Sequence, residues 1–256
     1  MTTTTSPTTA PGPMTNIVRL NNIDHAGLRV ITARGAEWGD AVNQIPVFPT
    51  EFEAVQRDFP IVLHRTPDGA WEALALLGLD RYENLFLDGD RWIARYIPAL
   101  LDRGPFSIGV HTGPDGQREP MVHIDLAHQR IVRDGSVTPA GEPLFLPHGG
   151  NAPYLERIQD ALQVIHTGYL AQSAMFGALA DAGLIEPVRI EIQLDETLRY
   201  DLVDFHTVGI EALARLSGAA LESLHRQGLL AAAVHIASSL GNVSRLIALK
   251  NAKRAG

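Results

Sequence analysis

The spacing of apolar residues in this chain changes once, near residue 150, and that change limits the folds open to it. Before this point, short apolar runs alternate with turn sequences, which is typical of β-hairpins. After it, apolar residues recur at helical spacing, as on the buried face of an amphipathic helix. The sequence therefore predicts an α+β fold, with an antiparallel sheet of hairpins in the N-terminal two-thirds and a helical C-terminal part.

Two turn sequences carry the hairpin prediction. Thr66-Pro67-Asp68-Gly69 separates apolar runs at 60–64 and 71–77, and the turn at 113–116 separates runs at 106–111 and 121–126. Proline fixes φ and glycine accepts a positive φ, so both sequences favour tight turns. Further strands are expected over 27–31 and 129–133, and a short helix over 51–57 with Thr50 as its N-cap.

The C-terminal part is expected to begin with a long helix. Asn151 is its expected N-cap, Pro153 lies in its first turn, and Gly183 ends it. Two strands and two further helices are expected after it, over 188–194, 199–205, 210–227 and from 229 onwards.

The chain is expected to form one domain. Residues 1–15 are rich in Thr, Pro and Ser, which predicts a disordered tail, and Met14 is an alternative start. A single α+β domain is expected over 16–250, followed by a short tail at 251–256. The N-terminal segment has no basic and apolar leader, so we expect a cytoplasmic protein. No apolar run approaches the roughly 18 residues that a membrane span needs, so we expect no membrane span.

Missing residue types exclude several chemistries. The chain has no cysteine, which excludes thiol nucleophiles, iron–sulfur clusters, disulfides and Cys-based zinc sites. Its only lysines are Lys250 and Lys253, near the C-terminus, so a P-loop lysine or an internal Schiff-base lysine is excluded. The formal net charge is −8, which argues against a nucleic-acid partner. We expect no cofactor and no tightly bound iron or zinc.

One pattern supports an enzymatic alternative. His123 and Asp125 are two residues apart on an expected strand, so both side chains lie on one face and resemble part of a two-His–one-carboxylate iron site. His206 or His166 would supply the third ligand of a metal-dependent oxygenase, and Arg189 or Arg199 would hold the carboxylate of its 2-oxoacid. A solvated pair on the outer face of the strand explains the same spacing.

Other residues indicate polar or partner-binding positions. His25 follows Asp24, and His235 lies among apolar helical residues. Together with Asp125, these two residues are expected ligand or polar positions. A single hydrogen bond, in a loop for His25 or in the core for His235, also explains each histidine. The stretch 92–106 is aromatic, basic and bounded by proline. Its expected partner-binding residues are Trp92, Arg95, Tyr96, Arg103 and Phe106.

Several stretches together resemble the SapC family. They begin with His25 and Leu28-Arg29-Val30, continue through Phe59-Pro60-Ile61-Val62 and the segment 92–106, and end with Gly228-Leu229-Leu230 and Asn242. The ordered set covers about 21–249. The resemblance concerns the bacterial SapC-like proteins and not the peptide-transport permease of the same name, which is a membrane protein.

The resemblance implies an association with bacterial surface layers and outer-membrane uptake, and no particular catalytic mechanism. The sequence has an aromatic and basic segment but no complete set of catalytic residues. We therefore expect a non-enzymatic accessory protein that binds a peptide or protein partner in a bacterial surface-layer or outer-membrane uptake system. The oxygenase built on His123 and Asp125 is the alternative, and a structural surface-layer component is a third possibility.

Overall fold

The computed structural model describes residues 2–3, 16–112, 117–133 and 141–255, and it confirms the α+β fold class. The strands are β1 (Thr2–Thr3), β2 (Ile17–Arg19), β3 (Arg29–Val30), β4 (Gln44–Val47), β5 (Ile61–Arg65), β6 (Trp71–Leu76), β7 (Leu87–Asp88), β8 (Arg91–Trp92), β9 (Phe106–Thr112), β10 (Arg118–Asp125), β11 (Ile131–Val132), β12 (Glu142–Pro143), β13 (Ile185–Gln193) and β14 (Arg199–Val208). The helices are α1 (Phe52–Val55), α2 (Ala99–Asp102), α3 (Pro153–Asp181), α4 (Ile210–Ala214), α5 (Gly218–Arg226), α6 (Leu229–Ser239) and α7 (Val243–Ala255), with 3₁₀ turns η1 (Ala36–Trp38), η2 (Pro49–Glu51) and η3 (Leu240–Asn242).

Both predicted hairpins are present. Strands β5 and β6 pair antiparallel, and the turn between them closes with Thr66 N–H donating to Ala70 O, while Gly69 has a φ of 84°. Strands β9 and β10 also pair antiparallel, although their turn at 113–116 lies outside the described residues. The strand expected over 129–133 is β11, and it pairs with β3 because a turn after Asp125 leads the chain away from β10.

The sheets divide between two hydrophobic cores. In the described part of the chain, the main sheet has the order β1-β14-β5-β6-β4, with β13 paired to β14, and it carries the main core. Smaller sheets, β2-β10-β9 and β11-β3-β12, surround the second core. The main sheet thus draws two of its strands, β13 and β14, from the C-terminal third.

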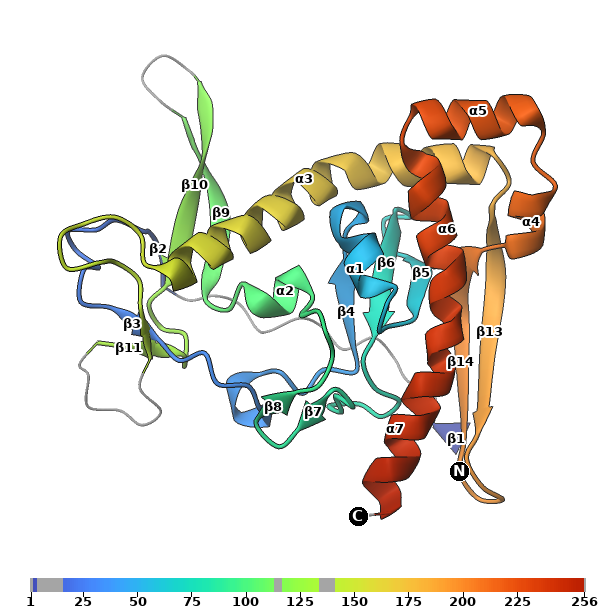
Figure 1. Cartoon of the computed structure of the whole chain (residues 1–256), viewed down its shortest axis with the longest axis horizontal. Coiled ribbons are helices and arrows are strands. Elements are labelled where there is room, and N and C mark those ends of the chain that lie inside the picture. The colour runs from blue at the N-terminus through green and yellow to red at the C-terminus, as the bar shows by residue number, and fades with distance from the viewer. Residues whose placement is uncertain (1, 4–15, 113–116, 134–140, 256) are drawn as a thin grey trace.

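Helix α3 connects the two cores, as Figure 1 shows by its course from the β9–β10 hairpin to α5 and α6. Leu155, Ile158 and Leu162 near its start are buried in the second core. Phe176 and Leu179 near its end are buried in the main core. One continuous helix of 29 residues therefore packs against both halves of the fold.

Helix ends differ from the sequence prediction in three places. Thr50 is not an N-cap, because η2 already begins at Pro49 and the Thr50 hydroxyl donates to Val164 O in α3. The Asn151 side chain donates to Gln159, so α3 begins at Pro153 without a side-chain cap. The helix expected over 210–227 is two helices, since Ser217 caps a new one by accepting from Ala220 N–H.

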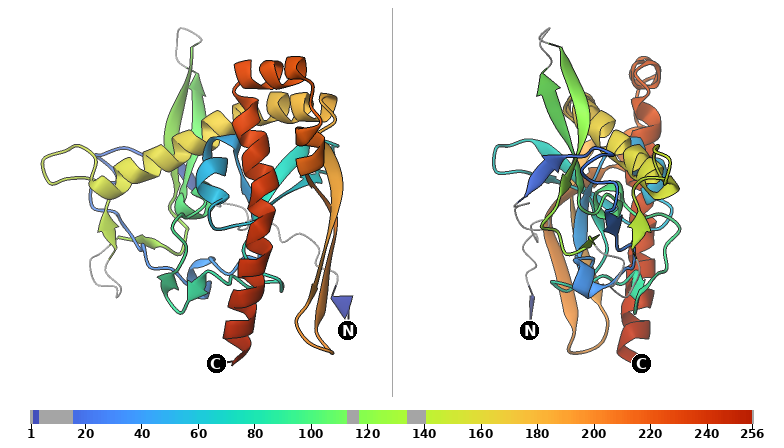
Figure 2. Two further views of the ribbon diagram at one scale, coloured as in Figure 1. Left: turned by 45° about the vertical axis from the view of Figure 1, so that its right-hand side comes forward. Right: turned by 90° about the vertical axis from the view of Figure 1, so that its left-hand side faces the viewer.

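The last 27 residues of the described chain run along one axis as α6, η3 and α7, which Figures 1 and 2 show as a single rod. Within the described residues, this stretch, Leu229–Ala255, is the one helix long and apolar enough to cross a membrane by length and composition. Ile236 and Leu246 of this rod are fully buried in the main core, while 33% of its most apolar 18-residue window is buried in the fold. Helix α7 continues to Ala255, so residues 251–255 are helical and not an irregular tail.

The expected N-terminal tail lies mostly outside the described residues, which omit residue 1 and residues 4–15. Thr2 and Thr3 form β1 and pair parallel with Arg199 and Tyr200 of β14. The disordered tail expected over 1–15 stays a prediction.

Two glycines of α3 predict opposite effects of the same substitution. A Cβ at Gly168 would lie 2.4 Å from the Phe48 Cβ and 2.5 Å from the Thr50 hydroxyl, whereas a Cβ at Gly177 would meet no atom within 4 Å. Alanine is favoured over glycine in a helix by about 1 kcal/mol, so Gly177→Ala should stabilise the protein by up to that amount. Gly168→Ala should instead destabilise it by about 1–3 kcal/mol through overpacking.

Urea denaturation of both variants measures the difference. Equal stabilisation by the two substitutions would show that α3 does not lie directly against Phe48 and Thr50.

Candidate functional site

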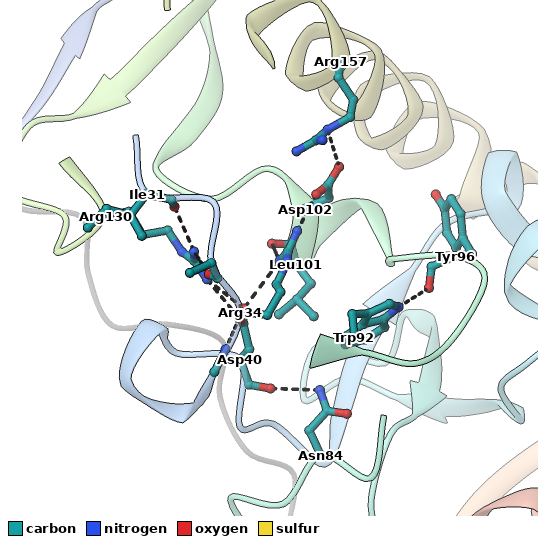
Figure 3. Close-up of polar contacts among 12 residues, drawn as sticks. Ile31, Arg34, Asp40, Asn84, Trp92, Tyr96, Leu101, Asp102, Arg130 and Arg157 are labelled. Carbon is teal, nitrogen blue, oxygen red and sulfur yellow. Dashed lines mark hydrogen bonds and ion pairs between the residues drawn. The ribbon is translucent and has the colours of Figure 1, made fainter. Parts of the chain in front are cut away.

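A buried ionic cluster, here called the Asp40 cluster, is formed around Asp40 by Arg34, Asp102, Arg130 and Arg157 (Figure 3). Asp40 is 1% exposed. Its Oδ2 accepts hydrogen bonds from Arg130 Nη2 at 2.9 Å and from Gly35 N–H at 3.0 Å. Its Oδ1 accepts from Arg130 Nη2 at 3.1 Å and from Arg34 Nη1 at 3.5 Å. Both oxygens of this carboxylate are therefore fully engaged inside the protein.

The Asp40 cluster joins segments that are far apart in the sequence. Arg130 Nη1 donates to Ile31 O and Ala33 O, at 3.0 and 2.6 Å. Arg34 also donates to Asp102 at the end of α2, and Asp102 in turn lies 3.4 Å from Arg157 Nε of α3. The cluster thus holds the loop after β3, α2, the start of β11 and α3 together.

A cavity of about 90 Å³ lies beside the cluster. Its walls come from η1, β4, α2 and the turn before β11. The apolar lining residues are Trp38, Val42, Ile45, Pro46, Leu100 and Leu101. The polar lining residues are Asp40, Gln44, Arg103, His128, Gln129 and Arg130.

Among the described residues that line the cavity, Arg103 is the one with a buried side-chain nitrogen that lacks a hydrogen-bond partner. Its Nη1 donates to Phe106 O at 2.6 Å, but its Nε is buried without a hydrogen-bond partner. Among the residues that the structure describes, no carboxylate lies within 4 Å of this guanidinium. Burial lowers the pKa of Arg103, because the charged form loses its hydration without gaining a counter-ion.

His128 is a second hydrogen-bonding group of the cavity lining. Its Nδ1 accepts from Arg130 N–H at 3.2 Å, so in the neutral ring Nε2 carries the proton. Burial, and then the positive charge of Arg130, lower the pKa of His128. The ring is therefore neutral at pH 7 and presents an N–H donor.

A wider groove, the α3 groove, lies between the segment 95–102 and α3. It has a volume of about 340 Å³. Its lining residues are Arg95, Tyr96, Ile97, Ala99, Asp102, Arg157, Asp160, Ala161 and Val164. The groove and the cavity share no lining residue.

Glu51 fixes the segment that lines the groove. This buried carboxylate accepts from the Tyr96 hydroxyl at 2.8 Å, from Ala99 N–H at 2.9 Å and from Phe48 N–H at 3.1 Å. Burial raises the pKa of Glu51, and burial together with the charge of Glu51 raises the pKa of Tyr96. The sequence carries a signal for part of this arrangement, since a Glu three residues after an N-cap commonly returns to the N-cap amide.

The expected partner-binding residues divide between surface and interior. Arg95 is exposed, and Tyr96 and Arg103 line hollows. Trp92 is half-buried, with its ring 6.2 Å from that of Phe59, and its Nε1 donates to Tyr96 O. Phe106 is 0% exposed in the second core, so the prediction that it contacts a partner is wrong.

Two of the three expected polar positions, His25 and Asp125, form hydrogen bonds within the fold. His25 is buried, and its Nδ1 accepts from Asn21 N–H. This is the loop hydrogen bond expected as the alternative to a ligand role. Asp125 is buried and its Oδ1 accepts from the backbone amides of Asn16 and Ala127. His235 is half-buried on α6.

The structure does not assemble the expected iron site. His123 and Asp125 are on β10, whereas His206 is on β14 of the main sheet, beside Trp71. The His123 ring lies over Gly109, where a Cβ would be 2.0 Å from it. No group of three metal-binding His, Cys, Asp or Glu side chains occurs in the described part of the chain. The oxygenase alternative has no geometry to support it.

No sequence pattern indicates Arg34, Asp40, His128, Arg130 or Arg157 as site residues. These residues stand alone in the sequence, and no spacing rule links them. Asp40 and Arg130, for example, are 90 positions apart.

Comparison with known proteins agrees with the resemblance in the sequence. The family model described as SapC matches residues 20–246, which is most of the chain. No curated protein and no solved structure matches the chain. Because the family model spans both cores, α3 and most of the C-terminal rod, the chain belongs to the SapC family.

Proposed function

We propose that this protein is a non-enzymatic accessory protein that binds a peptide or protein partner in the α3 groove. The observation that carries the proposal is that Arg95, Tyr96 and Ile97, from the aromatic and basic segment of the sequence, form one wall of this groove. Tyr and Arg are the residue types most enriched at the energetic centres of protein interfaces.

The segment is held in place before any partner arrives. Glu51 binds both the Tyr96 hydroxyl and the Ala99 amide, and Pro98 restricts the backbone between them. A surface that is already ordered loses little conformational entropy when a partner docks. This rigidity favours a recognition surface over a loop that adapts to its ligand.

The composition of the groove indicates the kind of partner. Ile97, Ala161 and Val164 provide apolar contacts, while Arg95, Arg157 and Asp160 provide charges of both signs. Such a mixed surface suits an extended peptide with apolar and charged side chains. The setting, a bacterial surface-layer or outer-membrane uptake system, rests on the family resemblance, and the cytoplasmic location stays a prediction.

A matched pair of variants on α3 tests this proposal. Ala161 lines the groove, whereas Ala171 is exposed on the same helix outside it. The immobilised protein, Ala161→Arg and Ala171→Arg are each incubated with a lysate of the native host, and captured proteins are compared by mass spectrometry. We expect partners retained by the unaltered protein and by Ala171→Arg to be reduced at least about tenfold with Ala161→Arg, since a bulky charge fills the groove. Equal capture by all three would overturn the groove as the binding surface.

A further inference from the structure

We propose that the cavity beside the Asp40 cluster binds a carboxylate carried on a short aliphatic chain, with Arg103 as its charge partner. This inference goes beyond the proposed function, because the cavity shares no lining residue with the α3 groove. It rests on the charge balance, the apolar walls and the size of the cavity.

The charge balance leaves one cation unpaired. Among the described residues that line the cavity, two carry guanidinium groups, Arg103 and Arg130, and one, Asp40, carries a carboxylate. Both oxygens of Asp40 are occupied by Arg130, Arg34 and Gly35. Arg103 is half-buried, and its buried Nε has no hydrogen-bond partner in the described part of the chain, so a bound anion would relieve the cost of its lost hydration.

The hydrogen-bond donors suit a planar anion. A guanidinium matches the two oxygens of a carboxylate geometrically as well as in charge. His128 supplies a neutral N–H donor, and Gln44 and Gln129 supply side-chain amides in the same lining. The whole chain has a formal net charge of −8, so this concentration of cations is a local property and not part of a generally basic surface.

The remaining walls suit a short hydrocarbon chain. Trp38, Val42, Ile45, Leu100 and Leu101 offer no charged group to a ligand. A phosphate or sulfate would leave oxygens without partners against this surface. The cavity volume of about 90 Å³ is smaller than a cavity of roughly 150 Å³ that accepts benzene, so the site fits about four to six non-hydrogen atoms.

A carboxylate of this size has two sources. It is either a free short-chain acid or the C-terminal carboxylate of a peptide that ends in a small aliphatic residue. Both present the same chemistry to Arg103, so the experiment includes an arm for each.

Isothermal titration calorimetry on the full chain tests the proposal with butyrate, with the uncharged butyramide, and with the peptide Gly-Gly-Val in free and C-terminally amidated forms. We expect at least one carboxylate probe to bind with a Kd of about 1 mM, as is common for ligands of few atoms. The matching amide should bind about tenfold more weakly or not at all, because it lacks the charge. Binding of butyrate identifies a free acid as the source, and binding of the free peptide alone identifies a chain end.

Arg103→Met removes the charge but keeps an unbranched side chain, and Arg226→Met is the control at an exposed position on α5. We expect Arg103→Met to weaken carboxylate binding by about tenfold or more and Arg226→Met to leave it unchanged. Equal binding of acid and amide, no binding of either acid, or full binding by a folded Arg103→Met would each overturn the proposal. The comparison of acid with amide uses the unaltered protein, so it remains decisive if Arg103→Met fails to fold. A negative result at the cavity does not bear on the proposal for the α3 groove, because lysate capture tests that surface separately.

Discussion

Replacing Asp40 with alanine is expected to lower the free energy of unfolding by about 3–5 kcal/mol, which is the usual loss when one member of a buried ion pair is removed. Asp40 is 1% exposed and neutralises Arg130, which is itself buried. Without the carboxylate, the Arg130 guanidinium would remain in the interior with backbone carbonyls as its only acceptors among the contacts described. The Gly35 amide would lose its acceptor as well.

Asp88→Ala is the matched control. Asp88 also pairs with an arginine, Arg91, but both side chains are exposed, so its replacement should change stability by no more than about 1 kcal/mol. Guanidinium denaturation of both variants and of the unaltered protein gives the comparison. Similar small losses for Asp40→Ala and Asp88→Ala would show that solvent reaches Arg130 and that the Asp40 cluster is not a buried ionic centre.

Leu162→Ala and Leu179→Ala are each expected to destabilise the protein by about 2–5 kcal/mol, as large-to-small substitutions in a core do. Leu162 is buried in the second core and Leu179 in the main core, and both belong to α3. Because this helix is shared, we expect either substitution to shift one cooperative transition for the whole protein. This tests the prediction of a single domain over 16–250.

Leu170→Ala provides the control on the same helix. Leu170 is 67% exposed, so its replacement should alter stability by no more than about 0.5 kcal/mol. Thermal unfolding is followed by circular dichroism for the helices and by tryptophan fluorescence, to which Trp71 and Trp92, both packed against the main core, contribute. Two separated transitions, with Leu162→Ala affecting only one of them, would show that the second core unfolds independently.

The features predicted well from sequence depend on neighbouring residues. The β5–β6 hairpin follows from Pro67, which fixes its own φ, and from Gly69, which accepts a positive φ. Gly183 and Gly228, with φ of 66° and 72°, end α3 and α5 for the same local reason. Ser217 is of a residue type favoured at N-caps, and it caps α5. The sequence nevertheless predicts one continuous helix there, because the apolar spacing continues on both sides of Ser217 without interruption.

The candidate site could not be predicted in the same way, because its geometry depends on contacts between distant segments. Apolar and aromatic residues at 92–106 indicated a recognition surface, but their spacing does not show which side chains face the interior. The structure places Phe106 inside and Arg95 outside. The Asp40 cluster depends on tertiary contacts of Arg34, Arg130 and Arg157 that no local pattern encodes.

The arrangement of the main sheet has a consequence for the order of events during synthesis on the ribosome. Strands β5 and β6 lie in the first third of the chain, but their partner β14 and the covering helix α6 come from its last quarter. The Ser239 hydroxyl accepts from Ile61 N–H, and Lys250 pairs with Glu83 across 167 positions. The nascent β5–β6 hairpin therefore exposes its apolar face until these late residues emerge. The described residues of the second core, in contrast, all lie at or before Ile165. The main core therefore closes only near the end of translation, after its early strands have been exposed to solvent.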